Sequence, residues 1–318
     1  WEQPDNNVTA HSTVQEYKRG QNFFIDHLGD LDVKEITLQR GLDYVNKLVE
    51  KKTGRFGGAV SNATIEKYVS GIRQVLNHSI DRNWIEADPW TNIGKRTKNR
   101  GKPKEERLAF EYDEIVAYFK QPIAEEEMMV SRILACTGYR LEEVTQLEYE
   151  DLIDLKQFSN ANQKEETIKV FSFKNRADFT VKEKASVRFC PLHKTLMPYL
   201  DKWIANRFKD GTPTGRLFDY RIHHESQKSS DKASKLIGKW VEKVRKFPEQ
   251  KLVTHSFRKS FTTFCATSGM EDSMRRYIGG WEQLGQDTNY LKYSADLAPV
   301  RDKLNEVNFD FIHGVADE

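Results

Sequence analysis

The sequence predicts a mainly α protein, in which an all-helical N-terminal domain precedes a mixed α+β domain with a small antiparallel sheet. Three observations support this prediction. Apolar residues recur at helical spacing through most of the 318 residues. The region 167–190 instead contains two short runs of β-forming residues. Between Lys95 and Lys104 the chain is rich in cations and has no apolar side chain, which is typical of a linker. The expected parts are therefore an N-terminal domain at 1–94, a basic linker at 95–107 and a C-terminal domain at 108–318.

Composition allows two folded domains and excludes several classes of protein. The chain is 38% hydrophobic, enough to supply a core for each domain. No apolar run reaches the roughly eighteen residues of a membrane-spanning helix, and the N-terminus lacks the pattern of a signal peptide. The cysteines are far apart and form no Cys-x-x-Cys pair, so neither a zinc site nor a disulfide framework is expected. We expect an intracellular, cytoplasmic protein with reduced, buried thiols at Cys136, Cys190 and Cys265.

The N-terminal half has the pattern of a small all-α domain. Apolar residues at helical spacing predict helices around residues 38–48 and 65–80. A first helix is expected to begin near the capping box Thr13-x-x-Glu16, and Pro89 and several glycines separate the helical segments. We expect about four helices. Because the segment has no cluster of His, Cys or paired carboxylates, its expected role is to grip a partner.

The C-terminal half combines helices with a small sheet. Helical patterns at 112–120 and 128–136 precede two β-forming runs at 167–173 and 186–190. The polar stretch 174–185 between the two runs predicts a β-hairpin with a long, charged tip. Helical patterns then resume and continue to the end of the chain.

Two segments place cations at the start of a predicted helix. In the first, a Thr-Gly turn precedes a helix on which Arg140 and Glu143 share a face. In the second, Thr254 is a candidate N-cap for a helix on which His255 and Arg258 share a face. Taken singly, each is more often a surface ion pair or a chance pattern. Because helix N-termini and guanidinium groups both attract anions, the two segments together predict a phosphate site.

The residues that follow Arg258 come in a distinctive order. An apolar helix ends at Ser268-Gly269, and the segment Gly279-Gly280-Trp281 follows. Trp281 lies 23 residues after Arg258. Tyr290 lies nine residues after Trp281. With this order and spacing the chain resembles the tyrosine recombinase or phage integrase family over essentially its whole length. The family signature is an Arg in a Thr-Gly-x-Arg turn, a Lys on a β-hairpin, His-x-x-Arg, then His or Trp, then a nucleophilic Tyr. Here the fifth position is Trp, as in the Cre-like minority.

The resemblance implies that DNA strands are cut and rejoined through a covalent intermediate. Tyr290 would attack the scissile phosphate and form a 3′-phosphotyrosyl link. Arg140 and Arg258 would hold the nonbridging oxygens and stabilise the transition state. Because the bond energy is stored covalently, no ATP is expected, and neither a metal nor another cofactor.

The remaining roles follow the same resemblance. His255 would assist proton transfer or hold the phosphate, and Lys174 would be the general acid for the leaving 5′-oxygen. The indole N–H of Trp281 can donate to the phosphate, whereas a Trp cannot relay a proton. Glu143 would support the active-site helix by pairing with a cation.

Two of these assignments have competitors in the sequence. Lys182 and Lys184 lie further along the same hairpin tip and compete for the role of general acid. Tyr293 is a second candidate nucleophile, although the spacing from Trp281 favours Tyr290.

Other functions are weighed against recombination. A type IB topoisomerase would use similar chemistry, and a DNA-binding accessory protein would have lost catalysis. A metal-dependent nuclease would need clustered carboxylates, which the sequence lacks. His223 and His224 have no third ligand at suitable spacing, so a loop is favoured over a metal site.

Double-stranded DNA crossover sites are the expected partner. Net charge is only +2, so DNA binding must be argued from local clusters. The family resemblance further implies a homotetramer on two DNA sites, with exchange of a C-terminal helix between protomers, and leaves room for accessory DNA-bending or directionality factors. A nucleoid-associated enzyme of bacterial or phage origin, without membrane contact, is expected.

The first residue, Trp1, indicates a trimmed chain that could have lost a further N-terminal DNA-binding domain. Six linker cations are the candidate phosphate contacts: Lys95, Arg96, Lys98, Arg100, Lys102 and Lys104.

Overall fold

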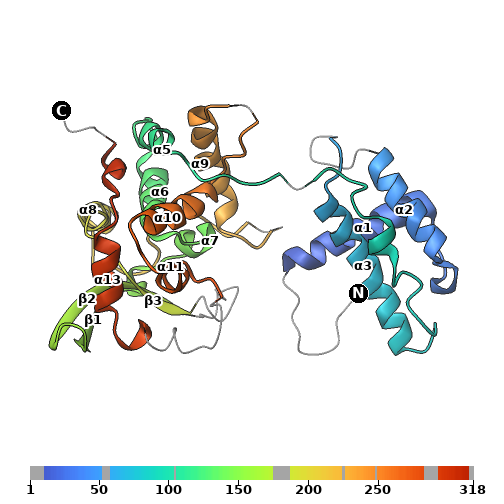
Figure 1. Ribbon diagram of the computed structural model, residues 1–318, viewed down its shortest axis with the longest axis horizontal. Helices are drawn as coiled ribbons and strands as arrows, with labels where there is room; N and C mark the ends of the chain where they lie inside the picture. Colours follow the sequence, from blue (N-terminus) through green and yellow to red (C-terminus); the bar gives the residue numbers. More distant parts are fainter. Residues whose placement is uncertain are drawn as a thin grey trace. The chain divides into compact units, whose positions relative to one another are not determined.

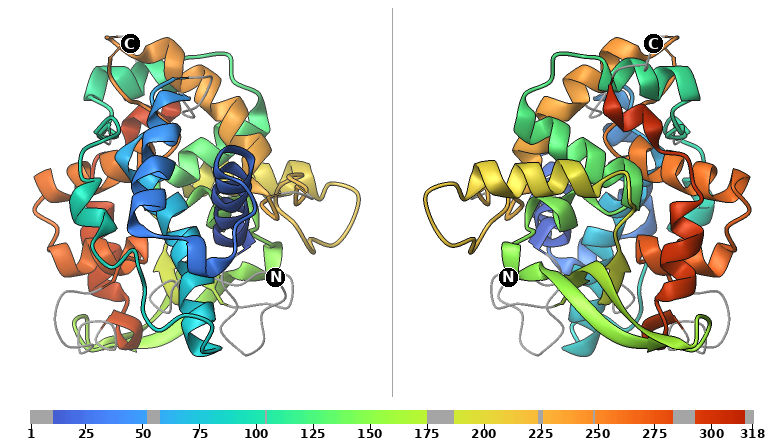
Figure 2. Two further views of the ribbon diagram at one scale, coloured as in Figure 1. Left: turned by 90° about the vertical axis from the view of Figure 1, so that its right-hand side faces the viewer. Right: turned by 90° about the vertical axis from the view of Figure 1, so that its left-hand side faces the viewer.

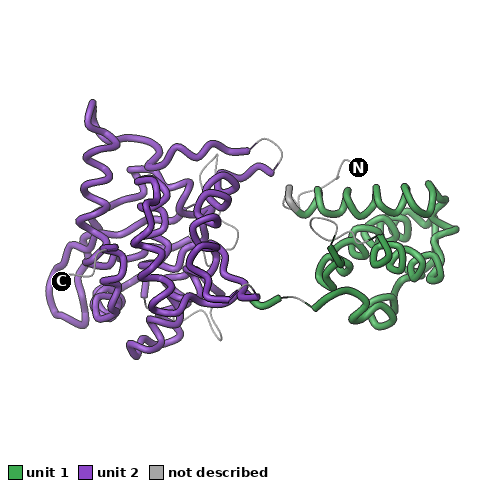
Figure 3. The backbone as a smooth tube through the Cα atoms, turned by 90° about the horizontal axis from the view of Figure 1, so that it is seen from above, with its two compact units in different colours: residues 1–106 green, residues 107–318 purple. Residues whose placement is uncertain are grey.

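The computed structural model describes residues 11–51, 58–103, 105–174, 187–223, 226–247, 249–282 and 293–314. The chain divides into two compact units, residues 1–106 and 107–318 (Figure 3). Each unit has its own hydrophobic core. Among the described residues, no helix is both long and apolar enough to cross a membrane.

Helices alone build the described part of the first unit, as the sequence predicts (Figure 1). Its α1 and α3 lie side by side where Gly20 faces Tyr68 and Gly71 faces Tyr17, and a Cβ on either glycine would lie 3.0 Å from a backbone atom of the other helix. Trp90 is fully buried and donates from its indole nitrogen to the Thr37 carbonyl at 2.9 Å. The elements are α1 (His11–Leu28), η1 (Val33–Glu35), α2 (Leu38–Glu50), α3 (Asn62–Asp81) and α4 (Ile93–Arg96).

One prediction about where the helices of this unit begin is wrong. α1 begins at His11, so Thr13 lies inside the helix and the expected capping box does not start it. The observed caps are Thr37, whose side chain accepts from the Arg40 amide at 3.3 Å, and Ser61, which accepts from the Thr64 amide at 3.2 Å. Both are residue types that cap helices well.

Most of the predicted linker is part of the first unit. Lys95 and Arg96 belong to α4, and Thr97 is buried and donates to the Ile93 carbonyl at 2.9 Å. Lys102 donates from its backbone to Val60 at 2.8 Å. Backbone hydrogen bonding therefore holds a stretch that its composition predicts to be solvated. Lys104 lies outside the described residues.

The second unit combines a small antiparallel sheet with helices. The strands are β1 (Leu152–Ser159), β2 (Lys164–Phe173) and β3 (Arg188–Pro191), in the order β1-β2-β3. The predicted hairpin corresponds to β2 and β3, whose register pairs Phe173 with Arg188, whereas β1 was not predicted. The helices are α5 (Tyr112–Phe119), α6 (Glu125–Thr137), α7 (Leu141–Thr145), α8 (Met197–Arg207), α9 (Ser230–Val244), α10 (Ser256–Thr267), α11 (Asp272–Gly279) and α13 (Ala298–Asn305), with short 3-10 turns at η3 (Tyr149–Asp151) and η5 (Asp310–His313).

α6 and α10 pack against each other, and both contribute residues to the second core. The expectation of buried thiols is confirmed, because Cys136, Cys190 and Cys265 are all free and buried. Burial raises the pKa of each thiol. These cysteines therefore serve packing.

The C-terminal segment docks on its own unit. α13 runs beside β2 in Figure 1 and in both views of Figure 2. Phe309 stacks on Phe261 with ring centres 6.1 Å apart, and Phe311 packs against Phe119 and Phe264. All the apolar residues predicted for this end are buried: Leu297, Val300, Leu304, Val307 and Phe311.

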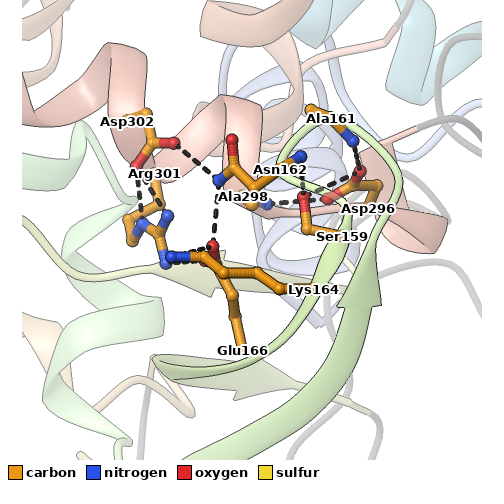
Figure 4. A network of polar contacts seen from close by, with 9 residues as sticks. All are labelled: Ser159, Ala161, Asn162, Lys164, Glu166, Asp296, Ala298, Arg301 and Asp302. Carbon is orange, nitrogen blue, oxygen red and sulfur yellow. Dashed lines mark hydrogen bonds and ion pairs between the residues drawn. The ribbon is translucent and has the colours of Figure 1, made fainter.

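A polar network fastens the start of this segment to the turn between β1 and β2 (Figure 4). Asp296 accepts from the Ser159 hydroxyl at 3.3 Å and from the Ala161 amide at 3.2 Å. Arg301 pairs with Glu166. The chain is therefore anchored immediately after the segment that contains Tyr290.

Candidate active site

The predicted Thr-Gly turn joins two helices of the core. α6 ends at Thr137, and Gly138 takes a left-handed conformation with φ of 62°. A Cβ at Gly138 would lie 2.4 Å from the Phe261 ring, so both conformation and space require glycine. The chain then turns into α7 with Arg140 at its N-cap.

Glu143 lies between two guanidinium groups. Arg140 donates to it from its backbone at 2.9 Å and from Nη1 at 3.0 Å, and Arg188 donates from Nη2 at 3.3 Å. Only 4% of the Glu143 side chain is exposed. Burial alone would raise the pKa of this carboxyl, but Arg188 and Arg140 hold it below its usual range. An ionised carboxylate thus orients Arg140.

Arg258 joins the same turn from α10. It is buried, and its Nη1 donates to the Gly138 carbonyl. Its guanidinium carbon lies 3.9 Å from the centre of the Trp281 ring. Arg140 reaches the same region, because its Nη1 also donates to the Gly280 carbonyl at 3.1 Å. Both arginines are therefore held between the Gly138 turn and the end of α11.

A left-handed glycine places Trp281 in this arrangement. α11 ends at Gly280, whose φ is 63°, and the Trp281 amide then donates back to the Arg276 carbonyl at 3.0 Å. This reversal is a common way to end a helix. It turns the indole toward α10.

His255 begins α10, as its N-cap residue. The predicted cap, Thr254, is wrong, because the Thr254 hydroxyl instead donates to the Ser234 carbonyl of α9 at 3.4 Å. Although part of His255 is open to solvent, desolvation by the surrounding protein lowers its pKa to about 4. Four cations act in the same direction, so the ring is neutral near pH 7: Arg107, Arg258, Lys259 and Arg140.

The described residues do not include every predicted member of the site. Lys174 is the exposed residue that follows β2. Tyr290, Lys182, Lys184 and His224 lie outside the described residues. Within the described part of the chain, no group of three or more His, Cys, Asp or Glu residues could hold a metal ion.

Tyr293, the competing nucleophile, is a packing residue here. It is 2% exposed, and its hydroxyl lies 2.6 Å from the Ser273 hydroxyl and 3.4 Å from Glu271. Burial raises its pKa. Its ring also packs on Tyr277, which is buried in turn. These contacts leave Tyr293 poorly suited to attack a phosphate.

Arg107 and Arg188 belong to this region and were not singled out from the sequence. Arg107 is one of the cations that lower the pKa of His255. Arg188 occupies an inward position of β3, two residues before the buried Cys190. A cation on the inward face of an apolar strand needs a buried carboxylate, and this signal could have identified it.

Comparison with known families shows which family the chain belongs to. The model of the phage integrase family matches residues 108–296, which is more than half of the chain. The chain belongs to the phage integrase family. It is a site-specific tyrosine recombinase, an enzyme that transfers DNA strands.

Solved integrase structures share this fold. The Tn1549 transposon integrase in complex with transposon right end DNA is 15% identical, with a TM-score of 0.61, and the match covers 97% of this chain and 93% of that one. A lambda integrase dimer bound to a COC′ core site is 13% identical, with a TM-score of 0.59, and the match covers 92% of each chain. A lambda integrase tetramer bound to a Holliday junction has a TM-score of 0.58 at 12% identity, covering 90% of this chain and 73% of that one. The search of curated proteins finds no match.

Proposed function

We propose that this integrase-family chain cuts and rejoins DNA through a 3′-phosphotyrosyl intermediate on Tyr290. The observation that carries the proposal is the convergence of Arg140 and Arg258 on the Gly138 turn and the Gly280–Trp281 end of α11. Two guanidinium groups held in this way suit the nonbridging oxygens of one phosphodiester.

The proposed reaction exchanges one phosphoester bond for another. The Tyr290 oxygen forms a bond to phosphorus while the bond from phosphorus to the 5′-oxygen breaks. The tyrosine proton passes to a base, for which a neutral His255 is suited. Lys174 gives a proton to the leaving 5′-oxygen. The 5′-hydroxyl of the partner strand then reverses these steps, so no ATP is consumed.

Arg140 and Arg258 supply the charge that offsets the developing charge on phosphorus oxygens. We propose that they make the reaction independent of metal ions. Cleavage in excess EDTA should then proceed at the rate seen with Mg²⁺, and a requirement for a divalent cation would contradict this part of the proposal.

The first unit is proposed to grip DNA as a clamp, with the linker cations at its phosphate contacts. Five of the six are exposed and lie within this unit: Lys95, Arg96, Lys98, Arg100 and Lys102. Lys98→Gln should lower the slope of log affinity against log salt by about 1. An unchanged slope would remove Lys98 from the interface.

The proposed assembly is a homotetramer on two DNA crossover sites, open to accessory DNA-bending or directionality factors. The lambda integrase tetramer on a Holliday junction is a precedent within the same fold. In this structure the C-terminal segment docks on its own chain, so exchange between protomers would require Phe309 and Phe311 to leave their own core.

The test uses nicked duplexes with randomised arms, because the target sequence is unknown. A nick near the scissile phosphate lets the short 5′-hydroxyl fragment diffuse away, which traps the protein on DNA. Duplexes that stay attached in denaturant are recovered and sequenced. Wild type and Tyr293→Phe should form adducts, whereas Tyr290→Phe should form none. DNA binding without any adduct would contradict the proposal.

A further inference from the structure

Arg188 is a fully buried cation at the start of β3. Its side chain is 0% exposed, and its guanidinium lies over two aromatic rings, 4.6 Å from the centre of Phe173 and 5.2 Å from that of Tyr139. A buried charge is costly unless hydrogen bonds and an opposite charge compensate it. Its polar contacts therefore indicate what the arginine is for.

One contact leads to the first active-site arginine. Nη2 of Arg188 lies 3.3 Å from one oxygen of Glu143, and Nη1 of Arg140 lies 3.0 Å from the other oxygen. Glu143 is itself nearly buried, so its position depends on both cations. Movement of Arg188 would therefore shift the carboxylate that orients Arg140.

A second contact leads to Trp281. Nε of Arg188 donates to the Ile278 carbonyl in the last turn of α11 at 2.9 Å. The backbone at Gly280 passes so close that a Cβ there would lie 2.5 Å from Nη1 of Arg188. β3 and α11 are neighbours in Figure 1. The arginine thus braces the helix end from which Trp281 returns to Arg258.

We propose that Arg188 is a positioning residue for phosphate binding, which holds Arg140 through Glu143 and Trp281 through the end of α11. This inference rests on the proposed recombinase chemistry. Arg188 does not touch the DNA itself, because it is enclosed. The Arg188 side chain acts on the phosphate-binding groups and not on the general acid, although its strand pairs with the one that precedes Lys174.

Arg132 offers a matched control within the same unit. Like Arg188, it donates from Nε to a backbone carbonyl, that of Ile312 at 3.1 Å, and its guanidinium lies 3.9 Å from the centre of the Tyr199 ring. These contacts lead to α8 and the C-terminal turn and to none of the proposed active-site residues. Arg132→Lys therefore measures the effect of losing an equivalent structural contact.

The experiment compares Arg188→Lys with Arg132→Lys on a duplex recovered by adduct trapping. Three versions of the scissile phosphate are used: the natural diester, a methylphosphonate and a 5′-bridging phosphorothiolate. A methylphosphonate lacks one anionic oxygen, so it depends less on guanidinium groups. A sulfur leaving group needs no proton, so it bypasses the general acid.

On the natural diester, Arg188→Lys should slow adduct formation by roughly 100-fold, because a displacement of about 1 Å has that effect in well-aligned sites. The loss of rate should shrink to about tenfold on the methylphosphonate. On the phosphorothiolate it should stay at roughly 100-fold, as on the natural diester. Arg132→Lys should cleave all three like wild type. The proposal would be overturned if Arg188→Lys lost the same rate on all three substrates or lost none. It would also be overturned if only the phosphorothiolate restored the rate.

A second measurement does not depend on cleavage. Amide hydrogen exchange at Gly280 and Trp281 should accelerate by about tenfold or more in Arg188→Lys and stay unchanged in Arg132→Lys. If Arg188→Lys does not fold, the pair Arg188→Met with Glu143→Gln removes both members of the buried ion pair, and it should show the same exchange and substrate pattern. Unchanged exchange in a folded variant would overturn the role of Arg188. Absence of adducts with wild type would instead contradict only the proposed function.

Discussion

The guanidinium of Arg258 stacks on the Trp281 ring at 3.9 Å, and this contact connects α10 to the end of α11. A desolvated cation–π contact of this kind contributes about 2 kcal/mol. Because Arg258 also donates to the Gly138 carbonyl, the contact helps to hold a guanidinium that is proposed to bind phosphate.

Substitution of Trp281 separates stacking from hydrogen bonding. Trp281→Phe keeps a ring over Arg258 but removes the indole N–H, whereas Trp281→Ala removes both. If stacking dominates, Trp281→Ala should slow adduct formation at least about tenfold more than Trp281→Phe, since about 1.4 kcal/mol corresponds to a factor of ten. Equal losses in single-turnover cleavage would show that the N–H is what matters.

Neutralising Glu143 should weaken the fold. Glu143→Gln leaves the buried Arg188 without a charged partner, and we expect a loss of roughly 3 kcal/mol in the free energy of unfolding. Urea denaturation at pH 7 measures this loss. The control is Glu50→Gln, which removes an exposed pair with Lys47 and should change stability by less than about 1 kcal/mol. Similar stabilities for both variants would contradict a structural role for the buried carboxylate.

His255 should titrate far below an ordinary histidine. Its lowered pKa of about 4 predicts a neutral ring throughout the range from pH 5 to 8 in the free protein. NMR of the ring protons, assigned with His255→Gln, should show a midpoint near 4. Binding of a DNA phosphate offsets the nearby cations and should raise that midpoint. A midpoint near 6.5 in the free protein would contradict the electrostatics of the site.

The general acid can be identified among the hairpin lysines. Lys174→Ala should slow cleavage of the natural diester by about 100-fold or more and recover on a 5′-bridging phosphorothiolate. Lys182→Ala and Lys184→Ala serve as comparisons and should cleave both substrates like wild type. Recovery seen only for one of these two would move the role of general acid to that residue.

Stability should fall in mild acid because of His193. This residue is buried against Phe309, and burial lowers its pKa to about 4. Below pH 6.5 the unfolded chain binds a proton that the native ring does not, so stability falls as pH drops from about 6.5 toward 4. At pH 5 this effect of His193 lowers the free energy of unfolding by about 2 kcal/mol relative to neutral pH.

His193→Asn tests this pH dependence. The Asn side chain can still accept from the Thr195 amide, which donates to Nδ1 of His193 at 3.1 Å, but it does not titrate. The drop in unfolding free energy between pH 7 and pH 5 should therefore be smaller in the variant. An identical drop would assign the effect to other groups.

Part of the fold could be predicted because its signals are local. Helical spacing predicted the helices of both units, and β-forming runs predicted β2 and β3. β1 has a weaker pattern, since Asp154 and Lys156 are residue types depleted in strands, and pairing with β2 defines it. The sequence could not show that Gly101 and Lys102, within the cation run at 95–104, bond to Asn62 and Val60, because these partners are distant along the chain.

The sequence by itself determined the family and the order of the chemical groups, because Arg140, His255, Arg258, Trp281 and Tyr290 stand at characteristic spacings along the chain. Only the tertiary structure decided how these groups are held. Arg188 reaches Glu143 across 45 residues and Ile278 across 90, and the C-terminal aromatic residues pack on helices far back in the chain. Such contacts depend on how the elements fold against one another, and no local pattern encodes them.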